Sequence, residues 1–277
     1  MKGLQIAYQL YSARKETLAD LKKVLKSLNK LGYDGVEFAG FCGYSAQEIK
    51  KMLADAGLEA ASSHVPVKDL KEDLGNIIAY HKKIGCRYIA IPYLEESQRP
   101  GKPGFADTIR FISETGRKCR KEDLRLLYHN HDFEFEKVSG MYGLDFLFAA
   151  VPEKWLQTEI DTCWADYSGV DPAAYLLKYA GRAPFVHLKD YVGSRGASTP
   201  YGLIGSEESH PDKEIVAFEY RPFGHGSQNV DALLDAAARS GTEWLIIEQD
   251  EHTGISPMEA AALSIQTIRK YEKKHEK

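Results

Sequence analysis

Four polar residues near the ends of apolar segments have the types and the order expected of a metal site. They are Glu134, Asp161, His187 and Glu248. Short apolar runs of this kind are typical of buried strands. If the four strands are neighbours, their ends meet, and three carboxylates held that close would repel one another unless a cation lay among them. We therefore expect one divalent ion, with Mn2+ preferred over Mg2+, Co2+ and Zn2+, since these ions accept mixed oxygen and nitrogen ligands.

Other polar residues stand at similar positions, and each has a structural as well as a functional interpretation. Glu37 and His64 lie in the second and third apolar segments and are equally well explained as hydrogen-bonded residues at the rim of a core. His129 and His131 are two residues apart in YHNHDFEF, so a strand would place both on one face. We expect these two histidines to contact the substrate or to hydrogen-bond the metal ligands.

Eight apolar segments alternate with helical patterns along the whole chain. The expected strands are 4–10, 35–39, 59–64, 88–93, 125–130, 156–161, 185–190 and 245–249. Leucine and valine recur three or four apart on one expected helix face, at Leu18, Leu21, Val24, Leu25, Leu28 and Leu31. Glycine follows such helical segments as a stop signal, at Gly32, Gly57, Gly85 and Gly241. Ser45 and Glu48 have the spacing of a capping box.

The fold class that follows is α/β, with a parallel sheet and right-handed crossovers. Eight repeats in 277 residues favour a single closed (β/α)8 barrel over residues 1–277. An open doubly wound sheet is the alternative, but no G-x-G-x-x-G segment follows any expected strand.

One connection is longer than the others. Residues 191–228, between a strand that ends near Asp190 and a helix that begins near Asn229, are rich in glycine and proline. Loops of this length are commonly functional or disordered, and in a barrel this one follows a strand and so lies on the catalytic face. We expect a lid or a partner-docking segment. Asp190, and Asp250 after the last strand, are interpreted as caps of the segments that follow them.

The composition limits the class of protein. Lys and Arg number 36 against 40 Asp and Glu, for a net charge of -4, which disfavours a nucleic-acid partner. We find no apolar stretch near the roughly 20 residues of a membrane span, and the first residues are too polar for a secretion signal. The four cysteines form no C-x-x-C pair and are expected to be reduced. We expect a cytoplasmic enzyme of small molecules, with no membrane partner.

Five segments resemble those of a known family. QLYSARKE, YHNHDFEF, EIDTCW, GRAPFVHLKD and IIEQD are similar to segments of the sugar isomerase/epimerase group of xylose isomerase-like barrels, a resemblance that covers essentially the whole chain. That group includes ketose 3-epimerases, inosose isomerases and dehydratases, hydroxypyruvate isomerase, and enzymes that cleave C-glycosides after oxidation to a 3-keto form. The resemblance implies one metal held by Glu134, Asp161, His187 and Glu248. We also expect a homo-oligomer, or a hetero-oligomer with a small partner subunit.

The chain departs from the family pattern near the expected substrate. Ketose epimerases have a histidine three residues after the aspartate ligand, and Trp164 stands there in this chain. The arginine expected after the histidine ligand is represented by Arg195 or replaced by Lys189. The expected substrate-binding residues are therefore His64, His129, His131, Trp164, Lys189 and Arg195.

The function that we expect is isomerisation or epimerisation of a keto-sugar or inosose. Glu134 and Glu248, on opposite faces of the substrate, would remove and return the proton next to its carbonyl. The alternative is a lyase with the same first step that then expels a β-substituent, as in inosose dehydration or 3-keto-C-glycoside cleavage. An endonuclease IV-like nuclease shares this barrel, but it would need several zinc ions and a basic DNA-binding face. A binding protein with a degenerate site is disfavoured by the complete ligand set.

Overall fold

Eight parallel strands form the centre of the molecule. The structure, a computed structural model, describes residues 4–193 and 218–275. The strands are hydrogen-bonded in the order β3-β2-β1-β12-β9-β8-β5-β4. Their bounds are β1 (Gln5–Gln9), β2 (Gly35–Phe38), β3 (Glu59–Ser63), β4 (Tyr88–Ile91), β5 (Arg125–His129), β8 (Gln157–Asp161), β9 (Phe185–Leu188) and β12 (Trp244–Ile247). A bridge between His64 and Ala90 joins the two end strands. The expected barrel and its eight strands are confirmed.

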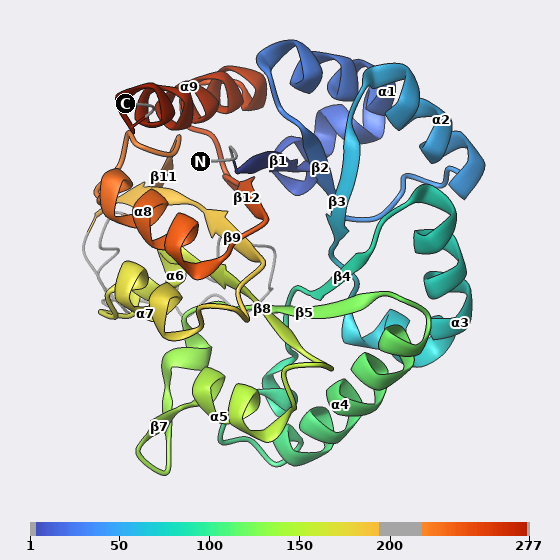
Figure 1. The fold of residues 1–277 in the computed structure, drawn as a ribbon, viewed down its shortest axis with the longest axis vertical. Coiled ribbons are helices and arrows are strands. Elements are labelled where there is room, and N and C mark those ends of the chain that lie inside the picture. Colours follow the sequence, from blue (N-terminus) through green and yellow to red (C-terminus); the bar gives the residue numbers. More distant parts are fainter. Residues whose placement is uncertain (1–3, 194–217, 276–277) are drawn as a thin grey trace.

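Helices surround the strands on the outside, as Figure 1 shows. They are α1 (Arg14–Leu31), α2 (Ala46–Ala56), α3 (Val67–Ile84), α4 (Phe105–Lys121), α5 (Gly143–Ala150), α6 (Thr162–Tyr167), α7 (Pro172–Lys178), α8 (Val230–Ser240) and α9 (Pro257–His275). Short 3-10 turns are η1 (Leu10–Ala13), η2 (Glu96–Gln98) and η3 (Phe133–Phe135). The expected stop glycines of α1, α2, α3 and α8 all adopt the left-handed conformation, and the capping box at Ser45 is present. These local signals set where the chain turns back into the barrel.

The apolar face expected on α1 is correct for most of the helix but wrong at Leu18. Leu21 and Leu28 are buried in the core, whereas Leu18 is 73% exposed. Asp20 has non-helical backbone angles, with φ -158 and ψ 84. Because this kink breaks the helical period, residues before it do not share the face of those after it.

Two short hairpins follow barrel strands. One pairs β6 (Lys137–Val138) with β7 (Met141–Tyr142), and the other pairs β10 (Asp190–Val192) with β11 (Glu219–Arg221). In the sequence, the two strands of the second hairpin are separated by most of the long connection expected at 191–228. Residues 194–217 of that connection, Arg195 among them, lie outside the described residues. The expectation that Asp190 caps the segment after it holds for Tyr191, whose backbone N–H its carboxylate accepts at 2.9 Å. The same carboxylate also accepts N–H groups of the returning segment, and Asn229 caps α8.

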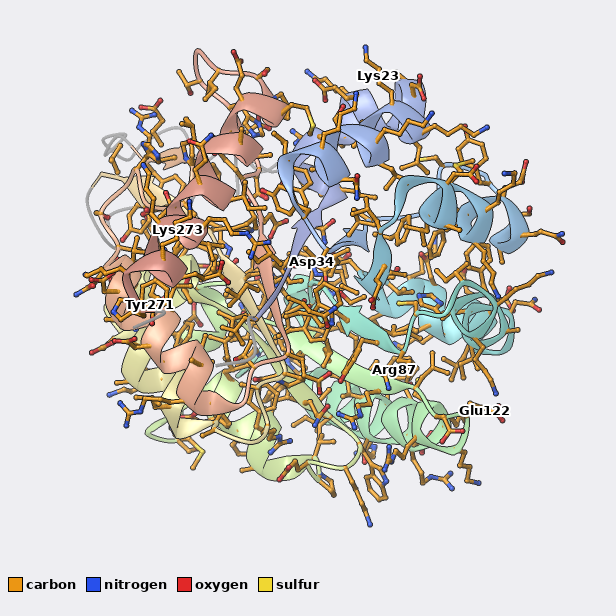
Figure 2. The ribbon with its side chains drawn as sticks, turned by 45° about the horizontal axis from the view of Figure 1, so that its top comes forward. Lys23, Asp34, Arg87, Glu122, Tyr271 and Lys273 are labelled. Atoms are coloured by element: carbon orange, nitrogen blue, oxygen red, sulfur yellow. The ribbon has the colours of Figure 1, made fainter. Side chains whose placement is uncertain are left out.

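Charged side chains cover the outside of the helical layer. In Figure 2, Lys23 projects from α1 and Lys273 from α9, while Asp34 and Arg87 mark the end of the barrel where β2 and β4 begin. None of the helices in the described part of the chain is long and apolar enough to span a membrane. The opposite end of the barrel, where the strands finish, carries the polar site.

Candidate active site

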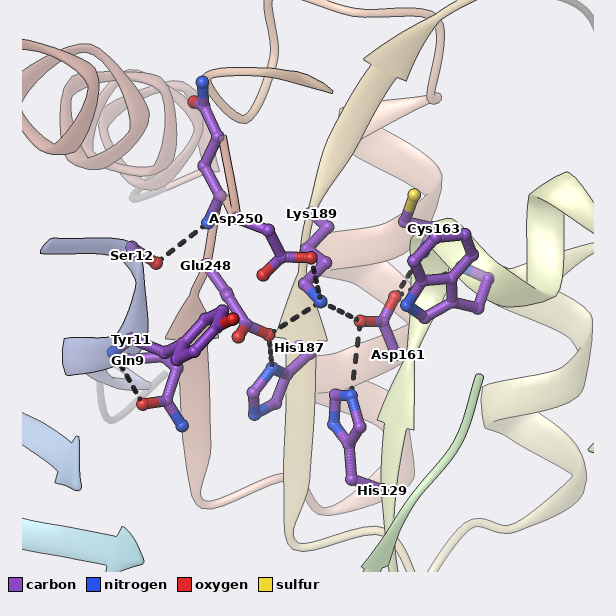
Figure 3. Close-up of polar contacts among 12 residues, drawn as sticks. Gln9, Tyr11, Ser12, His129, Asp161, Cys163, His187, Lys189, Glu248 and Asp250 are labelled. Atoms are coloured by element: carbon purple, nitrogen blue, oxygen red, sulfur yellow. Dashed lines mark hydrogen bonds and ion pairs between the residues drawn. The ribbon is translucent and has the colours of Figure 1, made fainter. Parts of the chain in front are cut away.

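Four donor residues meet at the carboxyl ends of neighbouring strands. His129 ends β5, Asp161 ends β8, His187 lies in β9 and Glu248 follows β12. One ligand atom from each lies within 4.8 Å of those of the others, and all four side chains are buried. We call these four residues the donor group. Their convergence, visible in Figure 3, results from the parallel barrel, which brings the ends of adjacent strands together.

A buried ammonium lies among the carboxylates of this site. Lys189 Nζ is 2.9 Å from Glu248 Oε2, 3.1 Å from Asp250 Oδ2 and 3.4 Å from Asp161 Oδ2. Burial alone would lower the pKa of Lys189, but attraction by Asp250, Glu248 and Asp161 raises it well above its usual value. The lysine is therefore protonated. The interpretation of Asp250 as a cap is wrong, because its carboxylate pairs with this lysine.

Both histidines of the donor group also face a deeper layer of carboxylates. His187 Nδ1 is 2.8 Å from Glu248 Oε2, and its Nε2 is 2.8 Å from Glu37 Oε2. His129 Nε2 is 3.7 Å from Asp161 Oδ2, and its Nδ1 is 3.5 Å from Glu159 Oε2. Each ring thus presents one nitrogen to the donor group and the other to a buried glutamate.

His64 ties the two deep glutamates together. Its Nε2 lies 2.9 Å from Glu159 Oε2 and 3.1 Å from Glu37 Oε2. Burial alone would lower the pKa of His64, but the two carboxylates raise it to about 10. His64, His129, Glu159 and His187 form a second set of donor atoms within 4.8 Å of one another. Glu37 and Glu159 do not line the cavity described below, whereas His64 does.

The donor group fits a divalent ion. It offers two carboxylates and two imidazoles, the mixed oxygen and nitrogen set that first-row divalent metals accept. Asp161 Oδ2 is buried and makes no hydrogen bond, and its contacts with Lys189 Nζ at 3.4 Å and His129 Nε2 at 3.7 Å are long, which leaves this oxygen able to bind an ion. Carboxylates behind the ligand histidines are the arrangement that fixes which nitrogen faces a metal.

Glu134 is not part of the donor group. It lies in η3, where its Oε2 accepts the His131 backbone N–H at 2.7 Å and its Oε1 accepts the Tyr128 hydroxyl. Burial raises the pKa of Glu134 to about 8. The chain leaves β5 at His129 and turns, so the strand-end donor is His129 and Glu134 is directed elsewhere. The position of His129 at the end of its strand, like that of Asp161, was the sequence signal that could have identified it as a donor.

The expected substrate contacts are placed differently from one another. A cavity of about 720 Å³ opens above the donor group, and His64, His129, His131 and Lys189 all line it. Trp164 is fully buried instead, with its ring 5.7 Å from the Lys189 ammonium. Four of the expected contacts therefore line the cavity. Trp164 does not line it and packs against Lys189 instead. Glu248 and Asp250 also line the cavity.

Fold and site together define a (β/α)8 barrel with a polar centre at the carboxyl ends of its strands. The chain belongs to the xylose isomerase-like TIM barrel family, whose model matches residues 25–271. It is 24% identical over 190 residues to an inosose dehydratase from Geobacillus kaustophilus, a match that spans 61% of each protein.

Solved structures share the fold over almost the whole chain. A sugar phosphate isomerase/epimerase from Parabacteroides distasonis superposes with a TM-score of 0.72 at 21% identity, covering 98% of this chain and 96% of that one. The zinc-containing IOLI protein gives a TM-score of 0.71 at 13% identity, covering 98% and 99%. At these identities the likeness shows the fold, and the chemistry must be argued from the site.

Proposed function

We propose that the chain is a metal-dependent lyase that removes a proton next to the carbonyl of a keto-sugar or keto-cyclitol and then eliminates a substituent from the next carbon. The observation that carries this proposal is the donor group of His129, Asp161, His187 and Glu248, of which His129 and Glu248 line the cavity. The sequence relative named inosose dehydratase favours elimination over isomerisation.

The donor group would hold the ion. A divalent metal supplies a Lewis acid that withdraws electrons from a carbonyl and so acidifies the neighbouring C–H bond. Mn2+ is the proposed ion, and the zinc of the IOLI protein supports a divalent metal on this fold.

Lys189 and Asp250 are the remaining charged pair on the cavity wall. The protonated Lys189 places a positive charge where a substrate oxygen becomes negative during proton removal. Asp250 lines the cavity but belongs to neither set of donor atoms, so its carboxylate stays available for proton transfer when an ion is bound. We assign Asp250 as the general base, and Glu248 as a ligand.

Two variants, Asp250→Asn and Glu248→Gln, distinguish this assignment from the expectation that Glu248 is both ligand and base. If Asp250 is the base, Asp250→Asn retains the metal and loses about 10²–10⁴-fold in kcat. Glu248→Gln would then reduce metal content, measured by elemental analysis. Near-normal turnover by metal-loaded Asp250→Asn returns the base assignment to Glu248.

The reaction class is tested with an inosose in D2O. We expect a dehydrated product, and deuterium at the carbon next to the carbonyl of recovered substrate when proton removal is reversible. A rearranged product of unchanged formula would identify an isomerase. If NMR shows full turnover with that C–H bond left intact, both the elimination and the isomerisation through proton removal are ruled out.

A further inference from the structure

The proposed elimination needs a proton donor as well as a base. When the bond to the departing oxygen breaks, that oxygen becomes negative, and a positioned acid lowers the barrier by giving it a proton. Lys189 has a different place in the proposed reaction, at the oxygen that becomes negative during proton removal. The proton that Asp250 removes and the departing oxygen are on neighbouring carbons, so the acid has to lie close to Asp250.

Three tyrosines line the cavity, and one of them comes from the strand beside Asp250. Among the described lining residues they are Tyr11, Tyr80 and Tyr93. Tyr11 lies in η1, directly after β1, and β1 is hydrogen-bonded to β12, the strand that precedes Asp250. Tyr93 follows β4, which stands opposite β12 in the strand order, and the Tyr80 hydroxyl donates to the Tyr44 carbonyl oxygen at 2.7 Å. Tyr11 is therefore the tyrosine next to the proposed base.

The Tyr11 hydroxyl is able to donate to a ligand. Tyr11 bonds other described residues through its backbone, whose N–H donates to Gln9 Oε1 at 3.0 Å, and its hydroxyl has no partner among them. The side chain is partly exposed, and Figure 3 shows it on the side of the site where Glu248 lies, away from Asp161. Partial burial raises the pKa of Tyr11 above its ordinary value, so the hydroxyl carries a proton at neutral pH.

Arg14 ties the backbone of Tyr11 to that of Asp250. Its Nη1 donates to the Asp250 carbonyl oxygen at 2.6 Å and to the Tyr11 carbonyl oxygen at 3.3 Å. Ser12 adds a second link, because its hydroxyl accepts the Gln249 backbone N–H at 3.0 Å. The guanidinium also lies 4.6 Å from the centroid of the Tyr11 ring, where its positive charge would stabilise a tyrosinate.

We propose that Tyr11 is the general acid of the elimination and gives its phenolic proton to the oxygen that leaves the substrate. This inference rests on the proposed function and adds a catalytic residue to it. Asp250 takes the proton next to the carbonyl, and the C–H electron pair forms the new double bond. The C–O bond of the next carbon breaks, its electron pair stays with the departing oxygen, and that oxygen takes the Tyr11 proton. The tyrosinate then regains a proton from solvent, so no oxidant or reductant is needed.

The test compares two departing groups. An inosose loses a hydroxyl, which has to take a proton, whereas an analogue with fluorine in place of that hydroxyl releases fluoride, a weak base that needs none. For Tyr11→Phe we expect kcat for loss of water to fall by about 10²–10⁴-fold and release of fluoride to stay near the parent rate, both followed by NMR. A loss for fluoride as large as that for water, or no loss for water, overturns the assignment.

Two controls separate a catalytic role from a structural one. Tyr11→Phe keeps the ring, so its Mn2+ affinity in calorimetric titration should match that of the parent. A weaker affinity would show that Tyr11 supports the metal site and would overturn the assignment. Tyr271→Phe, which removes a hydroxyl on α9 (Figure 2), should react with both substrates as the parent does.

The parent protein separates this inference from the proposed function. A parent that releases neither water nor fluoride contradicts the elimination, and the assignment of Tyr11 falls with it. A parent that releases both, with a Tyr11→Phe variant equally active on the inosose, leaves the elimination intact and overturns the role of Tyr11 alone.

Discussion

At the scale of residues, two deep glutamates lie behind the histidines of the donor group. Glu37 lies behind His187 and Glu159 lies behind His129, each facing the ring nitrogen that points away from the donor group. A ring that donates its N–H to a carboxylate keeps the other nitrogen unprotonated and correctly turned for a metal. Glu159 is two residues before Asp161 in the same strand, so the period of two could have identified it from the sequence.

Glu37→Gln should weaken metal binding without removing a ligand. We expect Mn2+ affinity to fall by about 10- to 100-fold, because the charge that fixes the His187 ring is lost while the side-chain shape is kept. Calorimetric titration with Mn2+ measures this. Glu243→Gln is the control, since Glu243 bonds the Tyr88 hydroxyl at the other end of the barrel. Unchanged affinity in Glu37→Gln would show that this glutamate only fills space.

Glu134 makes a prediction about stability and pH. Its pKa of about 8 exceeds the ordinary value of 4.5, so the folded protein keeps this proton to higher pH than the unfolded chain does. The contribution of Glu134 to the free energy of unfolding is therefore full below about pH 4.5 and is lost as the pH rises towards 8. Glu134→Gln should lose less stability between about pH 5 and pH 8 than the parent, measured by urea denaturation. Parallel pH profiles would contradict the raised pKa.

At the scale of elements, Asp190 organises the approach to α8. Its carboxylate accepts backbone N–H groups of Gly224, Gly226, Ser227 and Gln228 at 3.0–3.2 Å. A β-carbon on Gly226 would lie 2.2 Å from Asp190 Oδ1, so this glycine allows the close approach. One side chain thus replaces the backbone partners that a loop otherwise lacks.

Asp190→Ala should destabilise the protein strongly. We expect the free energy of unfolding to fall by about 2–4 kcal/mol, because several part-buried N–H groups lose a charged acceptor. Asp190→Asn, which keeps one acceptor oxygen, should lose less. Urea denaturation of both variants measures the difference. Equal losses would mean that charge, and not the number of acceptors, dominates.

The strands and helix stops were predictable because their signals are local. Apolar runs such as Tyr88–Ile91 and the glycines at helix ends act within a few residues. Glu134 lies outside the donor group, and Leu18 is exposed, for a non-local reason. Whether a chain turns after His129, or kinks at Asp20, depends on packing against other elements, which no short window of sequence contains. The pairing of Lys189 with Asp250 likewise depends on two strands meeting in the barrel.

At the scale of the whole molecule, metal binding should be coupled to thermal stability. An ion that binds only the folded barrel raises the free energy of unfolding by about 2.7 kcal/mol at a free concentration of 100 times Kd. Mn2+ should therefore raise Tm, and a chelator should reverse the shift, as followed by calorimetry. Absence of any metal-dependent shift would contradict a site in the folded state.

Asp161→Ala should abolish this metal-dependent shift. Because Asp161 also caps α6 through the N–H groups of Cys163 and Trp164, the variant should in addition be less stable without metal. Asp171→Ala is the matched control, since it removes the equivalent cap of α7 far from the donor group. The control should lose stability and keep the Mn2+ shift, so the two effects separate.

The ammonium of Lys189 affects how many metal ions the site is expected to bind. Asp161, Glu248 and Asp250 bring three negative charges and Lys189 brings one positive charge, which leaves two negative charges. One divalent ion beside neutral histidines would offset the net charge of these four side chains, whereas a second ion would leave an excess of positive charge among them in a buried place. The internal cation also keeps the ion-free centre from being three unopposed anions.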